Sequence, residues 1–253
     1  MKLSGKTVNA AAAAMAFGAI FFIVLCVVLH TAPDRLIGAA FCHQLPSRSP
    51  SSAFPFCFRC AGLFSGICWS ILFSLCSKSG EKLFEGKTIA AFAAAFLLFM
   101  LDIVNTTEYI PLHWYDEKPE IRFLSSFPLG FTLARIMTGI WLYFFNTFKT
   151  MEIFPPFLYL PFSAVTAGVS FLIVFRGDPF ILRCFGYLIS AGSLLFLLIL
   201  YSILIRCIAL LKNRYYQNSS VLMTALFIVF LHICLAGGLH ISFIPFESFV
   251  NIR

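Results

Sequence analysis

The chain is 253 residues long; 60% of its residues are hydrophobic and only 11% are charged. Soluble domains carry about 25% charged residues, so this composition excludes a soluble globular enzyme and indicates a protein of the lipid bilayer. The formal net charge is +7, but lysine and arginine are dispersed among short connections, which excludes the basic patch of a nucleic-acid-binding protein.

Seven apolar segments follow one another along the chain, each close to the length of about 20 residues that a helix needs to cross a bilayer. They cover residues 8–29, 60–75, 88–104, 129–147, 157–175, 180–211 and 221–244. The sequence therefore predicts an all-α polytopic bundle of about seven spans, forming a single membrane domain over residues 1–253. Residues 31–139 carry the motifs described below, and residues 148–253 add further spans.

The orientation follows from the basic residues on alternate sides of these spans. One side is rich in lysine and has short connections, whereas the other is rich in arginine and shares the acidic residues of two long polar connections, 31–59 and 105–127. Positive charge is enriched in short cytoplasmic loops. We therefore expect a cytoplasmic N-terminus and both long connections outside.

Three of the nine cysteines are clustered: Cys42, Cys57 and Cys60 fall within 19 residues, together with His43. The other six lie singly in or beside apolar segments, where cysteine packs as a small apolar residue. Cys57 and Cys60 form a Cys-x-x-Cys, whose spacing puts both sulfurs on one side of a helical turn. A proline just upstream suits the entry into a helix.

Three readings of this cluster remain open. Cys42, His43, Cys57 and Cys60 can bind a soft metal ion, most favourably zinc, because thiolate and imidazole are its preferred ligands. Alternatively, Cys57 exchanges a disulfide with Cys60 or Cys42, since a helix N-terminus and the neighbouring Arg59 favour the thiolate. In the third reading the thiols are reduced and only pack or form hydrogen bonds.

Asp102 and Arg135 fall inside apolar segments, where charges normally find a partner within the bundle. We expect Asp102 to pair with Arg135. Arg135, Thr138 and Gly139 share one helical face, on which glycine permits close helix packing and threonine supplies a hydroxyl. Such a pair can be purely structural. The functional alternative is an anion or substrate site, because guanidinium groups match phosphate; it would use Thr138 and the arginines Arg48, Arg59, Arg122 and Arg135.

These motifs resemble a prokaryotic family of integral membrane proteins, domain of unknown function 2085. The family pattern runs Cys-His-Gln, Pro, Arg-Ser, then Pro-x-Cys-x-Arg-Cys with Gly, an Asp near the end of a span, and Arg-x-x-Thr-Gly. In this chain it falls on Cys42, His43, Gln44, Pro46, Arg48, Ser49, Pro55, Cys57, Arg59, Cys60, Gly62, Asp102, Arg135, Thr138 and Gly139.

The resemblance implies a protein of a bacterial inner membrane with one shared site, but it implies no activity. The residues of that site are Cys42, His43, Cys57, Cys60, Asp102 and Arg135. The chain departs from the pattern after Asp102, where the family continues with Gly and Gln, whereas Ile103 and Asn105 stand here.

Our leading hypothesis is a membrane protein with a soft-metal site, zinc being the expected cofactor, at Cys42, His43, Cys57 and Cys60. One rival is a membrane thiol-disulfide oxidoreductase with Cys57, Cys60 and Asp102 as candidate catalytic residues and a quinone as a possible partner. The other is a transporter or enzyme for an anionic or phospholipid-like substrate bound by buried arginine. Under all three hypotheses we expect the protein to interact with the lipid bilayer and with a small-molecule, ion or lipid ligand, and not with nucleic acid.

Overall fold

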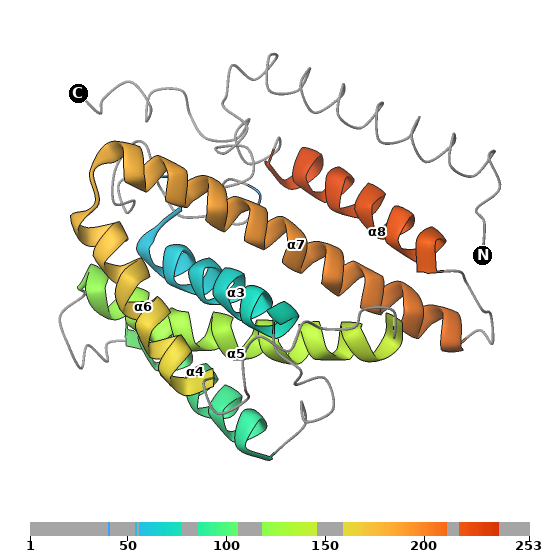
Figure 1. The fold of residues 1–253 in the computed structure, drawn as a ribbon, viewed down its shortest axis with the longest axis horizontal. Helices are drawn as coiled ribbons and strands as arrows, with labels where there is room; N and C mark the ends of the chain where they lie inside the picture. Colours follow the sequence, from blue (N-terminus) through green and yellow to red (C-terminus); the bar gives the residue numbers. More distant parts are fainter. Residues whose placement is uncertain are drawn as a thin grey trace. The chain divides into compact units, whose positions relative to one another are not determined.

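The computed structural model describes residues 40, 54, 56–76, 86–105, 118–145, 159–211 and 218–237 (Figure 1). Within these ranges the secondary structure is helical, without a strand, which confirms the predicted class. The elements are α3 (Phe58–Cys76), α4 (Gly86–Asn105), α5 (Pro119–Phe145), α6 (Tyr159–Arg176), α7 (Pro179–Leu211), α8 (Asn218–His232) and the π-helical turn η4 (Ile233–Gly237).

Five stretches of the described chain are long and apolar enough to cross a membrane: Thr88–Asn105, Pro119–Phe145, Tyr159–Arg176, Pro179–Leu211 and Asn218–Ala236. Phe58–Ser74 of α3 is also apolar but shorter. Six of the seven predicted segments therefore coincide, over their described residues, with helices. The first, 8–29, lies outside the described residues, so the count of seven and the cytoplasmic N-terminus stay predictions.

The chain divides into two compact units. The first is Gln44–Ile203, and the second combines Met1–His43 with Leu204–Arg253. In the second, buried Arg206 near the end of α7 donates a hydrogen bond to the Oδ1 atom of Asn218, the first residue of α8. The first unit contains α3 to α6 and most of α7, and it holds the described motif residues. The organisation as a single domain over 1–253 stays a prediction.

Helix α5 begins at Pro119, well before the predicted start at residue 129. Proline suits the first helical position because its missing N–H needs no partner there, and Glu120 complements the helix dipole in the first turn. The added turns contain Arg122 and Ser126, which lower the local hydropathy although both are buried. Hydropathy alone therefore placed the start too late.

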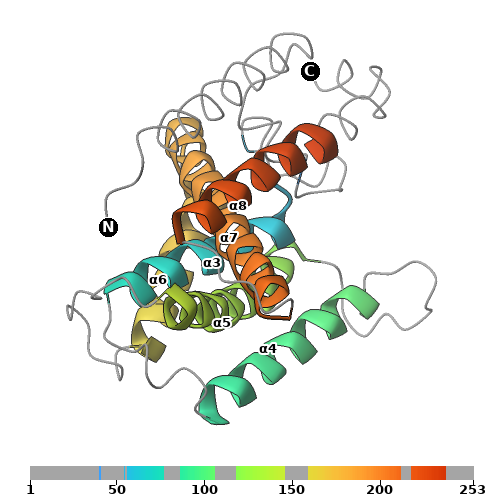
Figure 2. The ribbon, with the colours of Figure 1, turned by 90° about the vertical axis from the view of Figure 1, so that its right-hand side faces the viewer.

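Helices α3 and α5 pack against each other (Figures 1 and 2). Each of them carries a row of small residues. The rows have four-residue spacing and consist of Gly62, Gly66, Ser70 and Ser74 on α3, and of Ser126, Gly130, Ala134 and Thr138 on α5. A Cβ atom on Gly62 would meet the carbonyl oxygen of Phe123, and one on Gly66 would meet that of Phe127. From Gly62 to Gly66 the contact on α5 moves forward from Phe123 to Phe127, so the two helices run parallel. The small side chains permit their close approach.

The close approach of α3 and α5 gives a first prediction. A Cβ on Gly130 would collide with the backbone carbonyl of Leu63, which cannot move aside as a side chain can. Gly130→Ala is therefore expected to lower the free energy of unfolding by about 1–3 kcal/mol. Gly168→Ala on α6 is the matched control, since nothing lies within 4 Å of its Cβ position. Denaturant titration of both purified variants measures the difference, and equal stabilities would contradict the packing.

Helices α4 and α6 run opposite to α3 and α5, as successive membrane crossings require. The ring of Phe58 at the start of α3 stacks 5.1 Å from that of Phe175 at the end of α6. At the opposite end, the ring of Phe73 lies 5.8 Å from that of Tyr159, the first residue of α6. The starts of α3 and α5 and the ends of α4 and α6 thus share one side, which we call the Cys57 end; the opposite side is the Arg135 end.

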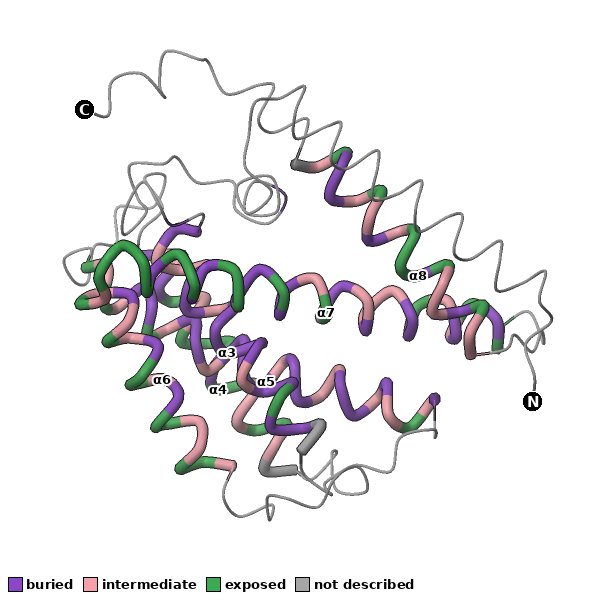
Figure 3. Tube along the Cα trace, turned by 45° about the horizontal axis from the view of Figure 1, so that its top comes forward, coloured by how far each residue is buried: buried purple, intermediate pink, exposed green. Residues whose placement is uncertain are grey.

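The burial pattern agrees with a bilayer environment (Figure 3). Helix α5 is buried along most of its length, whereas α4 and α6 are buried on a small part of theirs. The exposed residues of α4 are largely apolar and include Ile89, Phe96, Leu97, Leu98 and Leu101. Apolar residues on the outside of a helix bundle and polar residues inside it are the arrangement expected in lipid.

Candidate functional site

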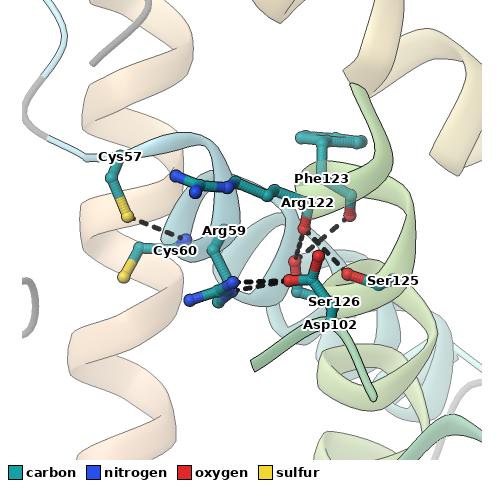
Figure 4. A network of polar contacts seen from close by, with 8 residues as sticks. All are labelled: Cys57, Arg59, Cys60, Asp102, Arg122, Phe123, Ser125 and Ser126. Atoms are coloured by element: carbon teal, nitrogen blue, oxygen red, sulfur yellow. Dashed lines mark hydrogen bonds and ion pairs between the residues drawn. The ribbon is translucent and has the colours of Figure 1, made fainter. Parts of the chain in front are cut away.

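The Cys-x-x-Cys motif forms the beginning of α3 at the Cys57 end (Figure 4). The carbonyl of Cys57 accepts the first helical hydrogen bond, from the N–H of Ala61 at 2.8 Å, so Cys57 is the N-cap residue. The backbone N–H of Cys60 donates to the Sγ atom of Cys57 at 3.5 Å. The sulfur therefore occupies the position that the side-chain oxygen of Ser, Thr or Asp usually takes, and it satisfies a helix N–H that has no partner within the helix.

Burial distinguishes the two cysteines. Cys57 is 4% exposed, whereas Cys60 is half-buried. Negative charge on either sulfur is favoured by the helix dipole, because both lie within the first turn. This arrangement agrees with the predicted location of the motif at a helix N-terminus and provides two soft ligands from one turn.

An ion pair connects the first turn of α3 to the last turn of α4. The Nε and Nη2 atoms of Arg59 donate to Oδ2 of Asp102 at 2.9 and 2.6 Å, and Asp102 is 1% exposed. The predicted pairing of Asp102 with Arg135 is thus replaced by a pairing with Arg59. The reason is the direction of α4, which ends where α3 begins and brings Asp102 to the Cys57 end.

Arg122 is a further charged residue at the Cys57 end. It lies in the first turns of α5 and is buried, and in Figure 4 its side chain extends toward the beginning of α3. Its carbonyl accepts hydrogen bonds from the hydroxyls of Ser125 and Ser126. The nearby Gly62 contacts α5 at Phe123, which places this turn of α5 beside the cysteine-bearing turn of α3.

Arg135 lies at the opposite end of the unit. Its Cζ atom is 4.1 Å from the ring centroid of Tyr159 and 5.9 Å from that of Phe73, and the residue is 5% exposed. Arg122 and Arg135 are 13 residues apart on one helix, which corresponds to about 20 Å. The three described arginines of the predicted anion site are therefore separated, with Arg59 and Arg122 at the Cys57 end and Arg135 at the other, so they do not form one site. Thr138 and Gly139 are buried on α5 near Arg135.

Three predicted site residues, Cys42, His43 and Arg48, lie outside the described residues. Over the ranges that the structure describes, no group of three or more His, Cys, Asp or Glu residues is placed to hold a metal ion. Of the four predicted metal ligands, the structure describes Cys57 and Cys60. The four-ligand metal site therefore stays a prediction.

Sequence reasoning missed two features of these ends. It singled out neither the Arg59–Asp102 pair nor the two rings beside Arg135, those of Phe73 and Tyr159. The four-residue spacing of Gly62, Gly66, Ser70 and Ser74 was visible in the sequence and would have identified the face of α3 that meets α5.

The apolar helices of spanning length and the charged residues buried among them are those of an integral membrane protein. Residues 42–136 match the family model of a predicted membrane protein, domain of unknown function 2085, which confirms the resemblance over that region. The matched region includes the cysteine motif, Asp102, Arg122 and Arg135, so both ends described above lie within it. The chain matches no curated protein and no solved structure.

Proposed function

We propose that this membrane protein binds a soft metal ion, zinc in the first instance, at the Cys57 end. Cys57 and Cys60 provide two thiolate ligands, and Cys42 and His43 complete a tetrahedral set of the kind that zinc prefers. The proposal extends to a bacterial inner membrane with a cytoplasmic N-terminus. The observation that carries the metal site is the N-cap position of Cys57, whose sulfur accepts the N–H of Cys60 at 3.5 Å. Hydrogen bonds of this kind orient a ligand and tune its basicity.

Two thiolates in one helical turn require a cation close to both sulfurs. The guanidinium of Arg59, the cation nearest to the cysteines in sequence, is paired with the buried carboxylate of Asp102 at 2.6 Å. Its charge is largely compensated there, so it contributes little to stabilising two adjacent thiolates. A divalent cation bound directly to the sulfurs supplies that stabilisation, because it is the largest local charge in such a site.

Metal analysis tests the proposal. The full-length protein, purified in detergent and loaded with zinc, is expected to retain about one zinc per chain after desalting, whereas Cys60→Ser is expected to retain less than about a tenth of that. Zinc removal by a chelator is expected to lower the Tm of the wild type and to leave that of Cys60→Ser unchanged.

Cys184→Ser is the matched control, because Cys184 is an exposed cysteine on α7. It is expected to bind zinc as the wild type does. A wild type that retains no zinc, or a Cys60→Ser variant that retains all of it, would overturn the proposal.

The N-cap geometry favours a second candidate, thiol-disulfide exchange. In this reaction the Cys57 thiolate attacks a substrate disulfide, one substrate sulfur leaves as a thiolate, and Cys60 then displaces the second by forming the Cys57–Cys60 disulfide. The substrate gains two electrons and two protons, and a dithiol reductant must reverse the change in the protein. Helix N-termini promote the attacking thiolate, and the sulfur of Cys57 in addition accepts the N–H of Cys60, so Cys57 is the proposed nucleophile.

A trapping experiment distinguishes the two candidates. Cys60→Ser cannot resolve the mixed disulfide, so under the exchange mechanism it accumulates a covalent adduct with a disulfide probe at Cys57, whereas the double variant with Cys57→Ser does not. The metal proposal expects zinc to protect Cys57 of the wild type from the same probe. No adduct in Cys60→Ser would exclude the exchange reaction.

A further inference from the structure

Asp102 is the only buried acidic residue in the part of the chain that the structure describes, and it is 1% exposed. Glu120 and Asp178, the other acidic residues of that part, are exposed. The Oδ2 atom of Asp102 accepts hydrogen bonds from Nε and Nη2 of Arg59 at 2.9 and 2.6 Å. Burial of two charges has a desolvation cost that their attraction often only offsets, so stability alone does not account for a buried ion pair.

The ion pair is attached to the turn that carries both described metal ligands. Arg59 follows Cys57 by two residues and precedes Cys60 by one. Successive helical residues are turned by about 100°, so the side chain of Arg59 leaves the helix in a different direction from that of Cys60. In Figure 4 the two sulfur atoms lie on one side of the Arg59 guanidinium and the carboxylate of Asp102 lies on the other. The carboxylate therefore binds the guanidinium from the side opposite the sulfurs.

Positive charge beside the sulfurs works against a bound cation. A guanidinium is always charged in a protein, so Arg59 places a permanent positive charge within one turn of both sulfurs. Arg122 brings a second guanidinium, since it is buried on α5 and its side chain extends toward the beginning of α3 (Figure 4). The repulsion of a metal ion by such a charge is proportional to the charge of the ion. The carboxylate of Asp102 cancels one positive charge, and solvent screens a buried pair only weakly.

We propose that Asp102 is a positioning residue that determines the charge specificity of the metal site. It holds and neutralises Arg59, and it thereby raises the affinity of the two sulfurs for a divalent soft ion more than for a monovalent one. The inference rests on the proposed metal site, and Asp102 acts through Arg59 without being a ligand itself.

Ion titration of the full-length apoprotein in detergent tests this role, with zinc as the divalent probe and copper(I), which thiolates also bind, as the monovalent probe. Asp102→Asn removes one negative charge at nearly constant shape. It is expected to weaken zinc binding about 100-fold and copper(I) binding about 10-fold, as for a unit charge about 10 Å away at an effective dielectric constant of about 25. Chromophoric competitor chelators measure both affinities.

Two further variants separate charge from structure. Arg59→Met combined with Asp102→Leu abolishes the ion pair but keeps the sum of the two charges at zero, so it is expected to bind both ions within about threefold of the wild type. This double variant also decides the question if Asp102→Asn does not fold, because removal of both charges leaves no buried charge without its partner. Asp178→Asn is the matched control at an exposed acidic residue, and it is expected to change either affinity by less than about twofold.

Three outcomes would overturn this role of Asp102. They are an unchanged zinc affinity in Asp102→Asn, an equal loss of zinc and copper(I) affinity in that variant, and a double variant that loses as much zinc affinity as Asp102→Asn does. In each of these cases the wild type still binds zinc, so the metal site itself would stand. A wild type that binds neither ion would overturn the metal site and the role of Asp102 together.

Discussion

Asp102→Ala is expected to lower the free energy of unfolding by about 3–5 kcal/mol, because it leaves the guanidinium of Arg59 without its buried counter-charge. The carboxylate of Asp102 is 1% exposed and accepts two hydrogen bonds from Arg59, at 2.6 and 2.9 Å. The pair connects α3 to α4, so its loss should also loosen the Cys57 end. Chemical unfolding of the purified variant beside the wild type measures the change.

Two comparisons separate the ion pair from a general effect of removing a carboxylate. Asp178 is exposed and accepts hydrogen bonds from the N–H groups of Phe180 and Ile181 at the start of α7, so Asp178→Ala should cost only about 0.5–2 kcal/mol, as for other N-caps. The double variant of Arg59→Met with Asp102→Leu removes both charges and should recover much of the loss. If Asp102→Ala were no worse than Asp178→Ala, the pair would not hold α4 to α3.

Phe131→Ala is expected to destabilise the protein by about 3–5 kcal/mol. The ring is 0% exposed and lies 4.9 Å from that of Tyr159 and 6.4 Å from that of Phe162, so it joins α5 to α6 beside Arg135. In lipid the loss comes from van der Waals packing and from the cavity left between helices, because lipid chains give no hydrophobic drive for helix association.

Phe180→Ala on α7 is the control for Phe131→Ala, since Phe180 is 75% exposed. It is expected to change the free energy of unfolding by less than about 0.5 kcal/mol. Phe131→Leu should be less destabilising than Phe131→Ala, because leucine leaves a smaller cavity between the helices. Similar effects for Phe131→Ala and Phe180→Ala would contradict the aromatic packing between α5 and α6.

The separation of the Cys57 end from the Arg135 end changes the functional hypotheses. The expected shared site of the cysteines, Asp102 and Arg135 is replaced by a cysteine-bearing turn with the Arg59–Asp102 ion pair beside it, and Arg135 lies about 20 Å away among the rings of Phe73 and Tyr159. The proposed metal site is therefore tested by variants at the Cys57 end alone.

Much of the candidate site could be predicted from local sequence. The three-residue spacing of Cys57 and Cys60 after a proline indicated two thiols in one helical turn, and this turn is where α3 begins. The partner of Asp102 could not be predicted in this way. Arg59 and Arg135 were both available, and the choice depends on which helix end lies beside the end of α4.

The sequence by itself determined the membrane character, the helical class and the approximate position of each described span, because apolar runs of spanning length must form helices in a bilayer. The start of α5 is the exception, since it lies ten residues before the predicted one. It also determined the family match over residues 42–136. The tertiary structure decided which charges meet. Asp102 reaches Arg59 because α4 runs opposite to α3, and Arg135 reaches Tyr159 because α6 begins where α3 ends. Pairing between helices depends on their direction and rotation, which are set by contacts such as those of Gly62, Gly66 and Gly130.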